Sequence, residues 1–554
     1  MSFILRCIDC GHKAPYFPTA INCPQCDSQW REAEYDLNTL SKTLPLQLPD
    51  RPFDLWRYHE LLPIRNLDPS LALGEGGTPL IKATNLGLML GCPNIFIKDE
   101  RQGPTASFKD RQAAVSIAAL KEAGITEMVV ASTGNVAIAY SAYAARAGIK
   151  LWAFVTSLVP AVKMREIALY GSQVIKVTGS YDNVKRAASE FAQQRNLYQN
   201  MGARSIPSIE SMKTIAYEIS EQMTAFLRTD NNKSLWRTPD WYVQSISGGM
   251  GPLGVAKGFS ELEEMGFINK KPAIAAIQTA GCSPMVTSWK KGLETAEVVE
   301  DPRTHIETLA TGDPGRTYKL LRKAIDASSG AFESVTDEEA FRAMHVLAKM
   351  EGISAEPAAA VAFAGLFKLV RAGVIKPDDT VVVNCTGHTM PPDKFVLGDD
   401  WARNIVLPED EFAKETPKEG ILAALSHVVP ERFSRVVIVD DTTEARLLIR
   451  RILQSQGDFT LFEAKNGKEA LRVIRRENPD LIILDLMMPE LDGFGVLDEL
   501  KANAETENIP VIVSTAKELT KEERERLKGQ IQSLLQKGDF MSDEFLDEVH
   551  TIIR

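Results

Sequence analysis

Short β-branched runs alternate with alanine-rich helical stretches between about residues 75 and 395, and this alternation constrains the fold most. The runs lie at 94–98, 151–155, 173–177, 273–277 and 380–383, and helical stretches include 136–147 and 358–370. Strands that read as continuous apolar runs are buried on both faces, so helices must cover both sides of a parallel sheet. The pattern therefore predicts α/β domains, with ligands at the carboxyl ends of the strands.

The size and charge of the chain limit its function classes. Its 554 residues are enough for three or four domains. The formal net charge of −11 gives no electrostatic support for binding nucleic acid. The N-terminus lacks the apolar core of a signal peptide, and the longest apolar stretch, 357–367, is too short to span a bilayer. We expect a cytoplasmic enzyme without a membrane or nucleic-acid partner.

Lys109 is the leading candidate for a catalytic residue. It lies in the segment PTASFKDR (104–111), between a turn of small residues and a helical run at 112–123. The start of a helix disfavours a charged ammonium, and a lysine that loses its proton easily can form a Schiff base. The alternative is an ordinary exposed lysine at the start of a helix.

Four segments occur in the order found in fold-type II pyridoxal-phosphate (PLP) enzymes. They are KDERQGPTASFKDR (98–111), STGN (132–135), SGGMGPLG (247–254) and CTGH (385–388). Together they resemble threonine synthases most closely, over about residues 1–400. The resemblance implies two α/β domains with the cofactor between them, as in the β subunit of tryptophan synthase, and a homodimer.

The resemblance also implies a role for each segment. Lys109 would bind the PLP aldehyde and later take the substrate α-proton. Asn135 would lie beside the phenolate oxygen, and Thr386 would face the pyridine nitrogen, which suits elimination and replacement chemistry. The backbone at Gly248, Gly249, Met250 and Gly251 would bind the cofactor phosphate. The alternatives are a helix cap for Asn135 and simple turns for the other segments; His388 receives no catalytic role.

The reaction that the resemblance implies is conversion of O-phosphohomoserine and water to threonine and phosphate. The family segment N-P-x-R-x-E-G-Q-K-T corresponds to SIPSIESMKT (205–214), which keeps Lys213 and Thr214. Serines stand at the Asn, Arg and Gly positions, namely Ser205, Ser208 and Ser211, and E-P-A-S-A reads EPAAA at 356–360. Arg204 is a neighbouring substitute. A serine or threonine dehydratase, another β-elimination or β-replacement enzyme, and a catalytically silent scaffold remain as alternatives.

The N-terminal cysteines form two pairs, Cys7-x-x-Cys10 and Cys23-x-x-Cys26. Each such turn directs two sulfurs to one point, so the four thiolates predict a tetrahedral zinc site in a ribbon over residues 1–40. The alternatives are a metal-free remnant, or disulfides in a secreted chain. The other three cysteines, Cys92, Cys282 and Cys385, indicate free thiols in a reducing compartment.

A separate module follows the enzyme-like region at 41–398 and a proline-punctuated linker at 399–434. Three strand-like runs end in Asp440-Asp441, in Asp485 and in Thr515. Carboxylates at the carboxyl edge of one parallel sheet can bind magnesium and position a phosphoryl group. Residues 435–554 resemble a flavodoxin-like response-regulator receiver domain, which implies phosphorylation of Asp485 and a phosphorelay partner such as a histidine kinase or phosphotransfer protein.

The receiver segment departs from its family near the end of the chain. The usual Lys-Pro on the last strand is absent, so Lys537 is the nearest phosphate-neutralising lysine and Lys517 competes with it; Thr515 would be the switch hydroxyl. The alternative is a docking domain that is never phosphorylated. Fusion of the two modules predicts that phosphorylation regulates the enzyme, with the apolar patch at 421–425 as the element that responds.

Overall fold

The computed structural model describes residues 3–18, 20–132, 134–156, 159, 161–177, 181–226, 236–388, 434–456, 459–515 and 519–536. The chain divides into two compact units. The first consists of Met1–Ala83, Asn94–Ala348 and Ser354–Met390, and the second of Thr84–Pro93, Lys349–Ile353 and Pro391–Arg554. The predicted linker patch at 421–425, Lys517 and Lys537 lie outside the described residues.

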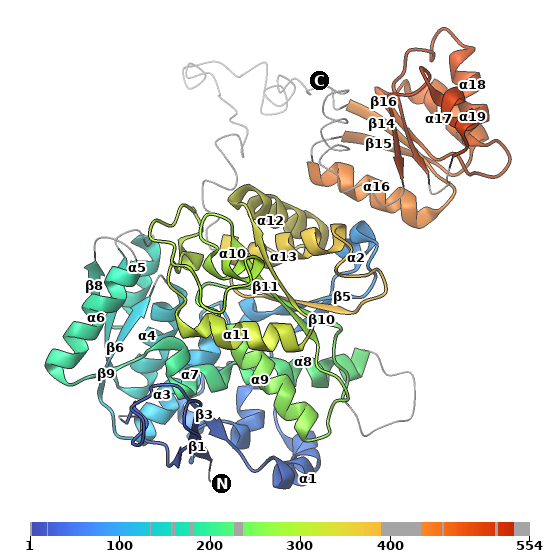
Figure 1. Cartoon of the computed structure of the whole chain (residues 1–554). Coiled ribbons are helices and arrows are strands. Elements are labelled where there is room, and N and C mark those ends of the chain that lie inside the picture. Colours follow the sequence, from blue (N-terminus) through green and yellow to red (C-terminus); the bar gives the residue numbers. More distant parts are fainter. Residues whose placement is uncertain are drawn as a thin grey trace, which may run out of the picture. The chain divides into compact units, whose positions relative to one another are not determined.

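The larger sheet of the first unit has six strands in the order β12-β11-β10-β13-β5-β4, of which β4 alone runs antiparallel to its neighbour. The strands are β4 (Leu80–Lys82), β5 (Ile95–Asp99), β10 (Trp241–Ser245), β11 (Ala273–Thr279), β12 (Ala331–Val335) and β13 (Val381–Cys385). One face packs on α8 (Lys213–Phe226), α9 (Met250–Glu264) and α11 (Arg316–Ala327), and the other on α13 (Pro357–Arg371) (Figure 1).

The smaller sheet of the first unit has four parallel strands in the order β8-β7-β6-β9. They are β6 (Glu127–Ser132), β7 (Lys150–Thr156), β8 (Gln173–Val177) and β9 (Tyr198–Gln199). Met128 and Val130 of β6 pack toward α3 (Lys109–Glu122) and α4 (Asn135–Ala147). Val129 points the other way, toward α6 (Tyr181–Arg195), as the two-residue repeat of a strand requires.

A small antiparallel sheet at the N-terminus has the order β2-β1-β3, from β1 (Ile4–Cys7), β2 (Lys13–Ala14) and β3 (Arg31–Glu34). The remaining α-helices outside the C-terminal region are α1 (Leu37–Gln47), α2 (Thr84–Leu90), α5 (Ala161–Leu169), α7 (Ile206–Ser211), α10 (Pro284–Lys290) and α12 (Asp337–Glu351). Short 3-10 helices cover Leu48–Asp50, Leu55–Leu61, Pro69–Leu71, Glu100–Gln102, Gly202–Arg204 and Glu307–Leu309.

The C-terminal region forms a five-stranded parallel sheet in the order β15-β14-β16-β17-β18. Its strands are β14 (Ser434–Val439), β15 (Phe459–Ala464), β16 (Leu481–Leu484), β17 (Val511–Thr515) and β18 (Ser533–Gln536). Its helices are α16 (Thr443–Gln456), α17 (Gly467–Glu477), α18 (Gly493–Lys501) and α19 (Lys521–Leu527). In chain order the strands lie 2-1-3-4-5, the flavodoxin-like arrangement.

The alternating pattern of the sequence is confirmed as α/β architecture. The five β-branched runs, at 94–98, 151–155, 173–177, 273–277 and 380–383, all overlap strands of the two large sheets. The helical run at 112–123 begins earlier, at Lys109, because the preceding loop is fixed by side-chain hydrogen bonds described below. Among the described residues, no helix is both long enough and apolar enough to cross a bilayer.

Candidate active site

Lys109 is the first residue of α3 and follows a loop held by hydrogen bonds. The carboxylate of Asp110 accepts hydrogen bonds from the backbone N–H of Thr105 at 3.0 Å and from its hydroxyl at 2.5 Å. Ser107 forms an isolated β-bridge with Gly387, which follows β13. These contacts fix the start of α3, and with it Lys109, beside the carboxyl end of a central strand.

The amine of Lys109 is prepared to lose its proton. Burial lowers the pKa of Lys109 from 10.5 to about 8, although the carboxylate of Glu356 pulls it upward. The amine lies 4.1 Å from the centroid of the Phe108 ring, and among the described residues it has no hydrogen-bond acceptor or ion-pair partner. A lysine in this state can act as a nucleophile toward a carbonyl or as a base.

Asn135, at the start of α4, lies between an acid and a base. Its Nδ2 donates to Oε1 of Glu356 at 2.8 Å, and its Oδ1 accepts from Nζ of Lys163 at 2.8 Å. Lys163 and Glu356 are themselves 3.5 Å apart. Gly134, with φ of 141°, is the N-cap of α4, so the capping alternative for Asn135 is wrong and its amide faces the neighbouring charges instead.

The glycine segment after β10 leads directly into α9. Gly248 has open space where a Cβ would stand, and Gly249 takes the left-handed conformation (φ 81°) at the N-cap of the helix. A Cβ at Gly251 would lie 2.4 Å from Nε2 of Gln244, so a larger residue there would displace the Gln244 side chain. The free backbone N–H groups at this helix start form a natural anion site.

Thr386 directly follows β13 and is 3% exposed. Its carbonyl accepts a hydrogen bond from the backbone N–H of Phe108 at 3.0 Å, which ties it to the Lys109 loop. A Cβ at Gly387 would lie 2.5 Å from Oε1 of Glu356, so a larger residue there would displace the carboxylate of Glu356. His388 donates its backbone N–H to Ala106, in keeping with a turn.

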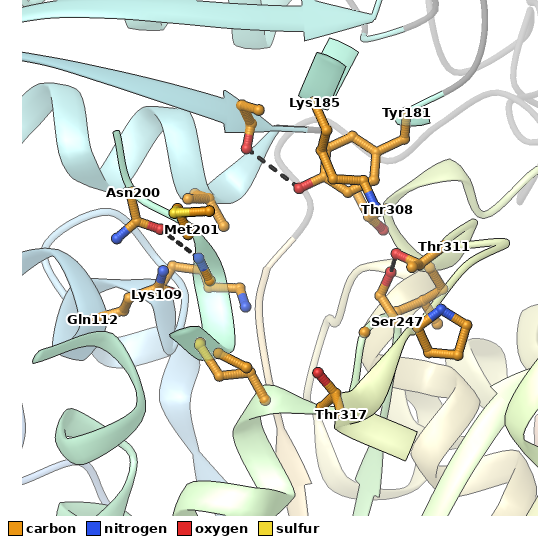
Figure 2. A pocket seen from close by; sticks show the side chains of 18 of the residues that line it. Lys109, Gln112, Tyr181, Lys185, Asn200, Met201, Ser247, Thr308, Thr311 and Thr317 are labelled. Atoms are coloured by element: carbon orange, nitrogen blue, oxygen red, sulfur yellow. Dashed lines mark hydrogen bonds between the residues drawn. The ribbon is translucent and has the colours of Figure 1, made fainter. Parts of the chain in front are cut away.

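One cavity of about 590 Å³ brings these predicted residues together. Lys109, Asn135, Gly248, Met250 and Thr386 all line it. Figure 2 shows Lys109, Gln112 and Asn200 on one side and Ser247, Thr311 and Thr317 facing them across the cavity. The site is therefore built from the carboxyl ends of β10 and β13 and from helices that cover the other sheet.

Three further cations line the same cavity: Lys185 of α6, Arg204 and Arg316 of α11. Arg204 donates to Oε1 of Gln29 at 2.6 Å, and burial lowers the pKa of its guanidinium. Arg316 forms an ion pair with Asp9, with Nη1 2.7 Å from Oδ2. The cations of the lining outnumber its carboxylates, Asp313 and Glu356, and this balance suits an anionic group on a bound molecule.

The serine-rich segment does not reach the cavity: no residue from Ser205 to Thr214 lines it. Ser208 is fully buried and shares hydrogen bonds with Ser116, Tyr140 and Asn200 at 2.8–3.2 Å.

Lys213 is likewise fully buried. Its Nζ lies 2.7 Å from Glu210 and 2.9 Å from Glu261. The lysine that the family segment retains is therefore occupied by carboxylates of the chain itself.

The four N-terminal cysteines form one cluster. Their sulfur atoms all lie within 4.8 Å of one another, with Cys7 and Cys26 at 3.6 Å and Cys10 and Cys23 at 3.7 Å. Zinc–sulfur bonds of about 2.3 Å in a tetrahedron require sulfurs about 3.8 Å apart. The spacing therefore fits a zinc ion bound by four thiolates.

Three carboxylates cluster at the carboxyl edge of the C-terminal sheet. Oxygens of Asp440, Asp441 and Asp485 lie within 4.8 Å of one another. Asp440 and Asp485 are buried and Asp441 is exposed, while Thr515 at the end of β17 is 1% exposed. Such an oxygen-rich edge suits a hard divalent cation.

Comparison with known proteins identifies both modules. Residues 71–387 match the pyridoxal-phosphate dependent enzyme family. The chain belongs to this family. Residues 436–550 match the response regulator receiver domain, so the C-terminal module is a receiver domain. The predicted family and the predicted fold class are confirmed.

The similar PLP enzymes include threonine synthases. That of Methanocaldococcus jannaschii is 33% identical over 69% of this chain and 91% of its own length. That of Methanosarcina acetivorans is 32% identical over 71% of this chain and 93% of its own. Diaminopropionate ammonia lyase from Escherichia coli shares the fold, with a TM-score of 0.50 and 18% identity over 64% of this chain and 91% of that one. The chain is a PLP-dependent lyase.

The cavity fits PLP. Its volume lies within the range of about 300–1,000 Å³ that is usual for cofactor sites. Lys109 offers an amine without an internal acceptor, and Gly248 leaves open space at the start of α9.

The sequence did not predict four of the residues at or beside the cavity: Lys163, Lys185, Arg316 and Glu356. A single charged residue inside a helical run carries no local signal. Glu356 alone had one, because its segment matches a family motif.

Proposed function

We propose that this PLP-dependent lyase is a threonine synthase, which converts O-phosphohomoserine and water to threonine and phosphate. One observation carries the proposal: a lysine with a lowered pKa and three cationic side chains line a single cavity. The similarity to threonine synthases over nine-tenths of their length supports the same reaction.

The residues that would hold PLP follow from the cavity. Lys109 would bind its aldehyde, Asn135 would lie near its phenolate, and Thr386 near its pyridine nitrogen. The backbone at Gly248–Gly251 would bind its phosphate at the start of α9. When bound, the cofactor supplies the electron sink that stabilises negative charge on the substrate α-carbon.

The proton chemistry falls to Lys109. With a pKa of about 8, its amine is partly neutral near neutral pH and can take the α-proton of an amino acid. Glu356 opposes the loss of the lysine proton, so it helps Lys109 to hold a proton after accepting one. Thr386 is a hydroxyl rather than a carboxylate, which favours elimination and replacement over transamination.

The substrate phosphate would be bound at the cations of the cavity. Arg204 carries the only guanidinium among them that, within the described part of the chain, has no carboxylate partner. A charge-assisted hydrogen bond to phosphate is about twice as strong as a neutral one. Arg204 thus takes the role that Arg plays in the family segment, at the position of Ser208 here.

A second candidate is a serine or threonine dehydratase or a β-replacement enzyme. It is favoured by the burial of Ser208 and by the pairing of Lys213 with two glutamates, which remove the family's own segment from the cavity. An amino acid without a phosphate group would not need these residues.

Turnover separates the candidates. Purified holoenzyme is given O-phosphohomoserine and, in parallel, serine, threonine and O-acetylserine. Release of phosphate with formation of threonine supports the threonine synthase reaction, and keto-acid formation from serine or threonine supports the dehydratase. Inactivity on the whole panel despite bound PLP would contradict both and favour a silent scaffold.

We further propose that Asp485 of the receiver domain accepts a phosphoryl group from a phosphodonor protein, with magnesium at Asp440 and Asp441. The clustering of the three carboxylates supports this. Wild-type protein with acetyl phosphate and Mg²⁺ is expected to gain an acid-labile phosphate, and Asp485→Asn is expected not to. Unchanged kinetics and oligomeric state with a beryllofluoride mimic would contradict regulation of the lyase.

A further inference from the structure

One residue of the N-terminal ribbon, Trp30, lines the cavity although it lies far ahead of Lys109 in the chain. We infer that the ribbon is part of the substrate site, because Gln29 and Asp9 hold Arg204 and Arg316 at the cavity in position for an anionic substrate group. The claim that the substrate carries an anionic group rests on the proposed reaction, whereas the positioning of the two arginines follows from their contacts alone. Gln29 and Asp9 are positioning residues, since they act through the arginines.

The first contact orients Arg204. Nη1 of Arg204 donates to Oε1 of Gln29 at 2.6 Å. Because the partner is a neutral amide, the contact fixes the guanidinium without cancelling its charge. Within the described residues this is the one hydrogen bond of the Arg204 side chain, so the ribbon supplies its polar anchor.

The second contact orients Arg316. Its two terminal nitrogens donate to the two carboxylate oxygens of Asp9 in a bidentate pair, and the guanidinium lies 5.6 Å from the centroid of the Trp30 ring. Trp30 itself lines the cavity. Asp9 cancels part of the charge of Arg316, so we expect Arg316 to contribute less to anion affinity than Arg204.

Both contacts depend on the cysteine cluster. Asp9 lies inside the first cysteine pair, and Gln29 and Trp30 follow the second pair within four residues. The Ser28 hydroxyl donates to Oδ2 of Asp9 at 2.5 Å, which joins the two turns. The same cluster that closes the ribbon therefore fixes the positions of both residues that hold the arginines.

The test measures binding of inorganic phosphate to holoenzyme by isothermal titration calorimetry. For Arg204→Gln we expect about tenfold weaker binding, since a charge-assisted contact is lost, and for Gln29→Ala about threefold. If Gln29 acts only through Arg204, the double variant binds phosphate no more weakly than Arg204→Gln alone. Lys13→Ala, which removes an exposed ion pair to Glu34 on the ribbon, is the matched control and leaves binding unchanged.

Arg316→Gln removes the second contact through a residue outside the ribbon, and we expect a smaller loss of phosphate affinity than for Arg204→Gln. Zinc content and the PLP absorbance are measured for every variant. Gln29→Ala with wild-type phosphate affinity, additive effects in the double variant, or no phosphate binding by the wild type would overturn the inference. Failure of the wild type to turn over O-phosphohomoserine, with phosphate binding that still follows this pattern, would overturn the proposed reaction alone.

Discussion

The Lys109 loop leads into α3, and the 205–214 segment forms α7, which contacts α3, and the start of α8. The two segments differ in how far they keep the family pattern. The loop keeps the pattern and delivers its lysine to the cavity. The segment departs from the pattern, and its serines and Lys213 are buried away from the cavity. A covalent bond to an aldehyde requires one amine at one point, whereas a phosphate can be bound by any cation within several ångströms. Cofactor chemistry is therefore tied to one residue, and recognition of a substrate phosphate can move between elements.

Substitution of Lys109 tests whether the cofactor chemistry depends on this one residue. Lys109→Ala is expected to lower kcat by about 10³-fold, since both the covalent anchor and the base are lost. It is also expected to abolish incorporation of PLP by borohydride reduction. Lys121→Ala, at the other end of α3, should leave both unchanged; activity near the wild-type level in Lys109→Ala would break the assignment.

Lys213→Met tests whether the retained lysine of the segment is structural. It leaves Glu210 and Glu261 buried with one fewer cation, and we expect a loss of stability of about 3 kcal/mol. The measurement is the thermal unfolding midpoint of holoenzyme, with KM for O-phosphohomoserine measured alongside. An unchanged midpoint with a raised KM would indicate that Lys213 contributes to substrate binding and not to stability.

Arg204→Gln tests whether Arg204, which lies outside the family segment at 205–214, binds the substrate phosphate. KM for O-phosphohomoserine is expected to rise about tenfold with a small change in kcat, because the contact is made equally in the ground state and the transition state. Arg303→Gln is the matched control, since Arg303 is exposed and does not line the cavity. Equal KM values for the two variants would place the phosphate elsewhere.

The pH dependence of cofactor loading gives the smallest expected effect. Apoenzyme takes up PLP through the neutral amine of Lys109, so the loading rate should rise with pH and level off above about 8. Glu356→Gln removes a charge that raises the pKa of Lys109, so the midpoint should move to lower pH. A midpoint near the ordinary lysine value in the wild type, or a move upward in the variant, would contradict the electrostatics of the site.

Much of the fold and part of the site could be predicted from sequence. Strands came from apolar runs, and the turn before Lys109 predicted a helix close behind it, although α3 begins at Lys109 and not at residue 112. The receiver domain was predicted from the acidic residues that end its strands. These features depend on neighbours within a few residues, which a sequence displays directly. Lys163 and Arg316 gave no such signal, because each is an ordinary charged residue on a helix until a distant partner is known.

The sequence by itself singled out the lysine that we propose to bind PLP, the four cysteines and the carboxylates of the receiver, since each lies in a recognisable local segment. Only the tertiary structure decided which cations meet at the cavity. Asp9 and Arg316 are 307 positions apart, and no local pattern joins them. The physical reason is that an ion pair depends on distance in space, which the packing of the ribbon, the two sheets and their helices sets together.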